Sequence, residues 1–163
     1  MIIWLSSYPK NGNTWLRSLI SSYYYTKDGL FLGDKQLQNI QQFPTKKFLE
    51  NFNYDLEKPG DSVRYWIEAQ EKINLDNKIK FFKTHNALWK LGKFTFTNEI
   101  NSKGVIHVVR DPRNVITSIL NHFNKTIDTY DKAFKFITDD KRMFGPDKIS
   151  LAENDLPTII SSW

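Results

Sequence analysis

Residues 2–16 read IIWLSSYPKNGNTWL, and this stretch decides the fold of the chain. It opens with four apolar residues, which is the pattern of a short strand buried on both faces of a sheet. A polar loop with a glycine at position 12 follows. From Asn13 onward, apolar residues at positions 15, 16, 19, 20 and 23 recur at the spacing of one helix face. A buried strand that leads through a glycine loop into a helix is typical of a parallel α/β sheet.

The same pattern recurs further along the chain. The runs at residues 79–82 and 105–109 have the length and the β-branched or aromatic content of buried strands. After the run at residues 105–109, a helix is predicted to begin at Asp111 and Pro112, because aspartate caps free N–H groups and proline is tolerated at the first helical position. We therefore expect one three-layer α/β/α domain over residues 1–163, built on a parallel sheet.

Residues 26–61 separate the first two predicted strands. This segment contains turn signals and several aromatic side chains, among them Phe43, Phe48 and Phe52. The aromatics predict an insertion that packs on the domain, not a free linker. Further helices are predicted from the apolar spacing at residues 62–73, 130–137 and 156–163.

Composition excludes several classes of protein. The chain has 163 residues, a net charge of +5 and no cysteine, which rules out a disulfide scaffold and thiol catalysis. Three histidines do not indicate a zinc site, and no apolar run approaches the roughly 18 residues of a membrane span. The basic residues form no long run, so we expect no nucleic-acid binding. The apolar run at residues 2–5 is too short for a secretory leader, and we expect a cytoplasmic protein.

Chemistry is expected where the strands end, because open parallel sheets bind ligands at the carboxyl ends of their strands. After the first strand, Gly12 permits a tight turn, and the N–H groups of Gly12, Asn13 and Thr14 would open a helix N-terminus that suits an anion. Lys10 adds a positive charge. The loop could equally be an ordinary surface turn, and its residues alone favour neither interpretation.

The other two strand ends carry further candidates. Alternation along the strand places Lys83 and His85 on one side, and a neutral imidazole beside a cation suits a general base. A partly buried, hydrogen-bonded histidine without catalytic function is the commoner case for a lone histidine. Arg110 and Ser118, eight residues apart, suit a second anion site, although a solvated helix face explains them as well.

Taken together, the three strand ends resemble one known family. The string YPKNGNTW at residues 8–15 is similar to the 5′-phosphosulfate loop, usually YPKSGTTW, of sulfotransferases that use 3′-phosphoadenosine-5′-phosphosulfate (PAPS). KTH at residues 83–85 resembles the strand end that carries their catalytic base. VRDPRNV at residues 109–115, with Ser118, is similar to their 3′-phosphate motif. The likeness runs from residue 1 to about residue 125 and is greatest to bacterial members.

This resemblance implies a fold like that of P-loop nucleotide triphosphatases and a metal-independent sulfuryl transfer. PAPS would be the donor, and a hydroxyl or amine of a small-molecule or carbohydrate acceptor would receive the group. His85 would act as the base, Lys10 would stabilise the leaving phosphate and Lys83 would lie beside the sulfuryl oxygens. Residues 26–61 would lie near the acceptor. The residues that would bind PAPS are Lys10, Asn11, Gly12, Asn13, Thr14, Trp15, Arg110 and Ser118.

The chain also departs from the family pattern. Asn11 and Asn13 replace the usual serine and threonine of the first loop, and Asn86-Ala87 replaces a frequent Leu-Pro after the histidine. The later glycine-rich element of the family has no match, and residues 160–163 resemble a segment that normally continues. We therefore expect the amino-terminal portion of a longer sulfotransferase. Two alternatives stay open: a non-catalytic nucleotide-binding remnant, and a P-loop kinase, although a kinase should show Gly-Lys-Ser/Thr.

Overall fold

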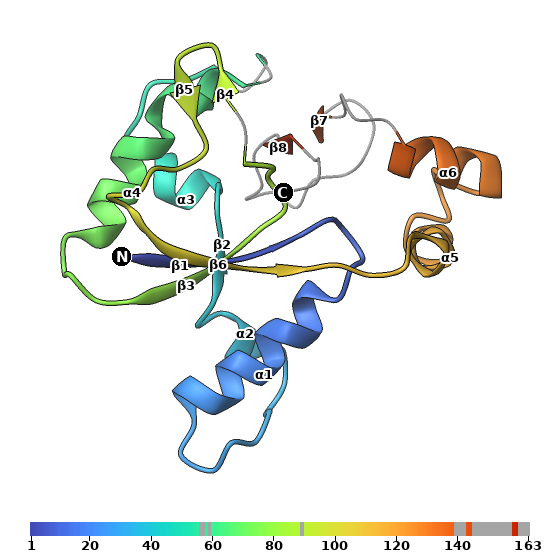
Figure 1. Cartoon of the computed structure of the whole chain (residues 1–163), viewed down its shortest axis with the longest axis horizontal. Helices are drawn as coiled ribbons and strands as arrows, with labels where there is room; N and C mark the ends of the chain where they lie inside the picture. Colours follow the sequence, from blue (N-terminus) through green and yellow to red (C-terminus); the bar gives the residue numbers. More distant parts are fainter. Residues whose placement is uncertain (56–57, 59, 89, 139–142, 145–157, 160–163) are drawn as a thin grey trace.

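The computed structural model describes residues 1–55, 58, 60–88, 90–138, 143–144 and 158–159 (Figure 1). The elements in chain order are β1 (Ile2–Ser7), α1 (Asn13–Tyr25), α2 (Asp34–Leu37), β2 (Gln41–Gln42), α3 (Lys46–Leu49), the 3₁₀ helix η1 (Asp61–Tyr65), α4 (Trp66–Asn74), β3 (Lys80–Thr84), β4 (Lys90–Leu91), β5 (Phe94–Thr95), β6 (Ser102–Val108), α5 (Pro112–His122), α6 (Tyr130–Thr138), β7 (Met143–Phe144) and β8 (Thr158–Ile159).

The central sheet has four strands in the order β2-β3-β1-β6, and every neighbouring pair is parallel. The chain leaves β1 through α1, builds β2 and β3 on one side of β1, and then crosses to β6 on the other side. The carboxyl end of β1 is therefore the point where the strand order reverses, which is where open α/β sheets bind ligands. The prediction of a parallel α/β sheet is confirmed.

Helices cover both faces of this sheet. In Figure 1, α1 and α2 lie below the sheet, α3 and α4 lie above it, and α5 and α6 lie beyond its right-hand end. The side chains of β1 alternate between the two faces, so Trp4 and Leu5 enter different clusters of buried residues. Leu5 packs with Ile40 and Phe81, while the partly buried Leu16 and other residues of α1 cover them.

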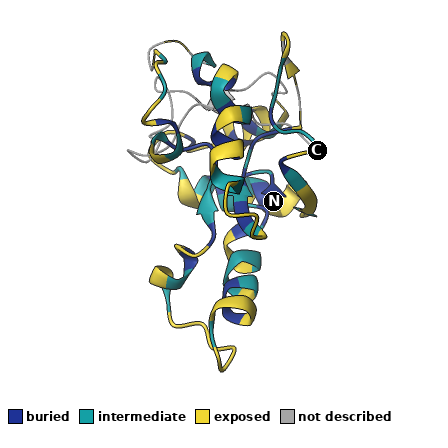
Figure 2. Cartoon of the chain, turned by 90° about the vertical axis from the view of Figure 1, so that its left-hand side faces the viewer, coloured by how far each residue is buried: buried dark blue, intermediate teal, exposed yellow. Residues whose placement is uncertain are grey.

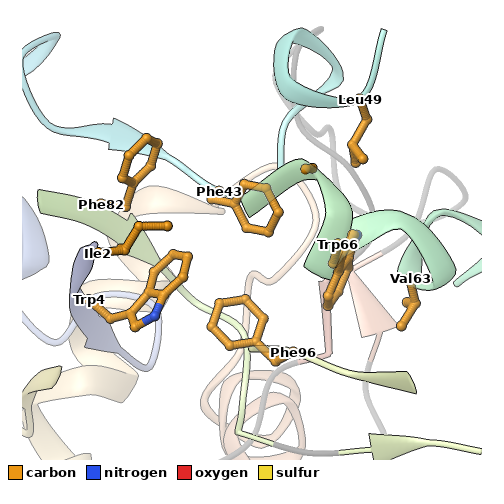
Figure 3. Packing of buried hydrophobic residues seen from close by; sticks show 9 residues of the cluster. Ile2, Trp4, Phe43, Leu49, Val63, Trp66, Phe82 and Phe96 are labelled. Atoms are coloured by element: carbon orange, nitrogen blue, oxygen red, sulfur yellow. The ribbon is translucent and has the colours of Figure 1, made fainter. Parts of the chain in front are cut away.

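The larger cluster is mostly aromatic and packs the sheet against α3, η1 and α4 (Figure 3). The ring centroids of Trp4 and Phe96 lie 4.8 Å apart, and those of Trp4 and Phe43 lie 5.8 Å apart. Phe43 is fully buried, and Phe48 and Phe52 pack against the cluster from its margin. The prediction that the aromatics of residues 26–61 pack on the domain is confirmed.

Three predictions about the strands need correction. The two later runs are displaced by one to three residues, to β3 and β6. The short strand β2 was not predicted, because Gln41 and Gln42 carry no apolar signal. Burial on both faces is wrong for β6, where Val105 and Ile106 are 47% and 42% exposed. The reason is position: β6 is the edge strand of the sheet in the described part of the chain.

The helices also differ in detail from their predictions. Figure 2 shows much of α1 exposed: Leu16 lies inward, but Trp15 and Tyr23 are 69% and 78% exposed. The cap of α5 is confirmed, because the Asp111 side chain accepts a hydrogen bond from the Arg113 N–H at 2.9 Å. The helix expected at residues 62–73 is split into η1 and α4.

The carboxyl-terminal prediction is wrong where the structure tests it. Within the stretch expected to be helical, Thr158–Ile159 forms β8 and pairs antiparallel with Met143–Phe144. The rest of that stretch lies outside the described residues. Within the described ranges, no helix is both long and apolar enough to cross a membrane.

Candidate active site

The three predicted strand ends meet at one edge of the sheet. Ser6 of β1 is level with Thr84 of β3 on one side and with His107 of β6 on the other. The loops that follow these strands therefore leave the sheet side by side. This register brings the glycine loop, His85 and Arg110 to the same end of the domain.

The glycine loop is fixed from below by the side chain of Asn13. Its buried Nδ2 donates to the Leu5 carbonyl oxygen at 2.9 Å and to the Ser7 hydroxyl at 3.1 Å. Asn11 is also buried, and its Nδ2 donates to the Val108 carbonyl oxygen at 3.4 Å. Both side chains hold the loop against the sheet. The Asn11 N–H donates to the Tyr8 carbonyl oxygen at 3.2 Å, so of these two residues only Asn13, at the first position of α1, leaves its backbone N–H for a ligand.

The upper side of the loop is open. Gly12 has a φ of 101°, a left-handed conformation that favours glycine, and a Cβ placed on it would meet nothing within 4 Å. No side chain caps the N-terminus of α1, and its first helical bond runs from the Leu16 N–H to the Gly12 carbonyl oxygen. The N–H groups of the first turn, including that of the exposed Thr14, therefore have no acceptor within the helix.

His85 is held in a defined tautomer. Its Nδ1 lies 2.8 Å from the carbonyl oxygen of Ser7. A carbonyl oxygen only accepts, so Nδ1 carries the proton and Nε2 keeps its lone pair in the neutral ring. Burial, and after it the positive charges of Lys83, Arg17 and Lys10, lower the pKa of His85 to about 3 against the opposing effect of the bond to Ser7. The imidazole is therefore neutral near pH 7.

Two residues near the end of β3, Gln42 and Arg17, were not predicted. The Lys83 Nζ donates to Gln42 Oε1 at 2.8 Å, which joins the end of β3 to β2. Arg17 of α1 donates to the carbonyl oxygens of Leu37 and Ile40 at 2.8 and 2.7 Å. Nothing in the sequence indicates these contacts, because β2 has no strand signal and Arg17 resembles any helical arginine.

Positive charge gathers between the glycine loop and α5. The Arg110 guanidinium donates to the Lys10 carbonyl oxygen at 3.4 Å. Partial burial and the charge of Arg110 lower the pKa of Lys10, and partial burial and Lys10 in turn lower the pKa of His122. Among the described residues, no carboxylate forms an ion pair with Lys10 or Arg110. The neighbouring carboxylate, Asp111, pairs with Arg113 instead. These charges suit an anionic ligand.

The remaining predicted residues lie on the helices that follow β1 and β6. Ser118 is partly buried on α5, and Trp15 is exposed at the start of α1. Their contact with a ligand stays a prediction. In the part of the chain that the structure describes, no three His, Asp or Glu side chains gather where they could hold a metal ion.

Comparison with known protein families identifies a family for this chain. The family model described as a sulfotransferase domain matches residues 2–147, most of the chain. The matched residues include β1, β3 and β6 and the loops that follow them. No curated protein matches the chain at a significant level.

Proposed function

The chain belongs to the sulfotransferase domain family, and from this membership we propose that it transfers the sulfuryl group of PAPS to a hydroxyl or amine of an acceptor. The observation that carries the proposal is the state of His85. It is neutral, its Nδ1–H is engaged by Ser7, and it lies beside Lys83 at the carboxyl end of the sheet. A base held in this way presents Nε2 to an acceptor proton.

The role of His85 is to remove that proton. PAPS supplies the sulfuryl group and a phosphate that leaves with the electron pair of the broken sulfur–oxygen bond. The acceptor oxygen or nitrogen forms the new bond to sulfur, and its proton passes to Nε2 of His85. Lys83 then lies close enough to the imidazole to oppose its protonation until negative charge from the substrate is present, which would keep the base free in the empty site.

The glycine loop and the basic group beside it would bind the phosphates. The open space above Gly12 and the uncapped N-terminus of α1 suit the 5′-phosphate. Lys10 would stabilise the charge that develops on the leaving oxygen. Arg110, with Ser118, would hold the 3′-phosphate. These side chains suit PAPS, because they are cationic and PAPS is an anion. Among the described side chains, Lys10 and Arg110 have no carboxylate partner.

A transfer assay tests the proposal. The native chain is incubated with PAPS labelled in the sulfuryl group and a mixture of hydroxyl and amine acceptors. We expect labelled product, and we expect His85→Ala to lower its rate by about 100-fold or more, the size of a general-base contribution. Nucleotide binding by His85→Ala should stay at the native level.

Other outcomes separate the alternatives. Activity of His85→Ala within about tenfold of native contradicts its role as the base. Tight binding of PAPS without any transfer supports a nucleotide-binding protein that is not catalytic. Preference for ATP with Mg²⁺ over PAPS supports a kinase.

The setting of the reaction is part of the same proposal. We place the protein in the cytoplasm. Its partners would be PAPS and the acceptor, with no nucleic acid.

A further inference from the structure

An open groove runs beside β2, away from the phosphate-binding loop. Its volume is about 910 Å³, within the size range of ligand sites. Ten side chains from α1, α2, β2, α3 and their flanking residues line it. Four of these are the cations Arg17, Lys35, Lys46 and Lys47, and one is the carboxylate of Glu50. The other five are four amides and a threonine, so no apolar side chain lines the groove.

The groove is linked to β3, the strand that precedes His85. Gln42, which lines it, accepts the hydrogen bond from Lys83, two residues before His85. Arg17, which also lines it, lies close enough to His85 to lower the pKa of the imidazole. The groove therefore lies on the β2 side of β3, the strand that leads to the candidate base. The phosphate-binding loop, by contrast, follows the central strand β1.

We propose that this groove binds the acceptor, and that the acceptor is an anionic carbohydrate, a sugar chain that carries carboxylate or sulfate groups as well as hydroxyls. This assignment rests on the proposed sulfuryl transfer. The structure supplies the groove, its position and its chemistry, and these define the substrate class.

The side chains of the groove match such a ligand in two ways. Amides both donate and accept hydrogen bonds, as sugar hydroxyls do. Cations bind carboxylate and sulfate groups through charge-assisted hydrogen bonds. Within the described ranges, Lys35 and Lys46 form no ion pair, and Lys47 donates only to the neutral Gln41 Oε1, at 2.9 Å. Their charges are therefore available to a ligand.

The lining also argues against other occupants. A flat phenol or a sterol gains its affinity from contact with apolar and aromatic side chains, and none lines the groove. A single-stranded nucleic acid would meet the same cations, but proteins that bind one stack its bases on aromatic rings. No aromatic side chain lines this groove.

Binding measurements on the full chain test the assignment. The probes are a heparin-derived hexasaccharide, the neutral maltohexaose, 2-naphthol and a uridine hexanucleotide. We expect the heparin hexasaccharide to bind most tightly. The double variant Lys46→Gln/Lys47→Gln should weaken it by about tenfold or more, and Lys35→Gln, on a different helix, by severalfold.

A matched control keeps the charge change constant. Lys103→Gln/Lys135→Gln removes two exposed lysines from β6 and α6, outside the groove. It should change the affinity by less than about twofold. Equal losses in the two double variants overturn the assignment, because they indicate attraction to overall charge. Equal or tighter binding of maltohexaose, naphthol or the hexanucleotide overturns it as well.

The same titrations separate this inference from the proposed function. Binding of 3′,5′-ADP, the product nucleotide, is measured on every variant. If the nucleotide binds and the hexasaccharide does not, the acceptor assignment fails while the proposed reaction stands. If the hexasaccharide binds and no adenine nucleotide does, the groove binds carbohydrate and the proposed reaction fails.

Discussion

Stability toward acid should depend on His85. In the folded chain, burial and neighbouring cations lower its pKa to about 3, from 6.5 for a free imidazole. Below pH 6.5 the unfolded chain therefore binds a proton on this ring that the folded chain does not bind. Protonation then favours the unfolded state, and the free energy of unfolding falls as the pH drops from 6.5 toward 3.

The size of the effect follows from the two pKa values. At pH 8 both states are neutral, and the contribution of His85 is close to zero. At pH 5 the unfolded ring is almost fully protonated and the folded ring is not, which costs about 2 kcal/mol. This figure changes little as long as the folded pKa stays well below 5, so it does not depend on the last unit of the shift.

The assay is urea unfolding at pH 8 and pH 5, for the native chain and for His85→Gln. Glutamine retains a side-chain N–H that can donate to Ser7 but does not titrate. Other ionisable groups contribute equally to both proteins, so the loss of stability on acidification should be about 2 kcal/mol smaller in the variant. His122→Gln is the control: His122 is exposed, and its removal should leave most of the native loss in place.

Two results would refute this reasoning. One is an equal loss of stability in the native chain and in His85→Gln. The other is an NMR titration in which the His85 C2–H signal moves with a midpoint near pH 6.5, which would mean that the ring is protonated as freely as in water.

Three further predictions concern the site and its support. Arg110→Ala should weaken binding of 3′,5′-ADP by about tenfold and leave 5′-AMP nearly unchanged in calorimetry, because one charge-assisted phosphate contact is lost; equal losses for both nucleotides would exclude the 3′-phosphate role. Asn13→Ala should lower the free energy of unfolding by about 1–3 kcal/mol, since two buried acceptors lose their donor; an unchanged urea midpoint would show that the loop does not need this amide. Trp4→Ala should cost about 3–5 kcal/mol or prevent folding, and Ile79→Ala, an exposed apolar residue beside β3, should cost far less; similar losses would contradict the aromatic core.

The sequence predicts best where local chemistry and tertiary structure agree. β1, the helix after Gly12 and the aspartate cap of α5 each carry a strong local signal, and each occurs where expected. β2 carries none, because two glutamines become a strand only through pairing with β3. In α1 the helix predicted from the apolar spacing is correct, but its apolar face is only partly covered by the rest of the domain.

Some residues of the candidate site could likewise be predicted from the sequence, and others could not. The glycine loop, His85 and Arg110 follow strands directly, so their positions could be predicted from the order of the elements. The contacts of Arg17, Gln42 and His122 depend on how separate segments pack, and no spacing in the sequence encodes them. The groove proposed for the acceptor stands between the two groups. Nine of its ten lining residues fall in residues 26–61, which the resemblance places near the acceptor, but the groove itself forms only where four elements pack together.

The central claim is that the carboxyl end of β1 binds a nucleotide with phosphates at both its 3′ and 5′ positions. Calorimetric titration of the native chain with 3′,5′-ADP and with 5′-AMP tests it most directly. The account predicts that 3′,5′-ADP binds about tenfold or more tightly than 5′-AMP, and that Lys10→Ala weakens both. Equal affinity for the two nucleotides, or no binding of 3′,5′-ADP, would contradict it.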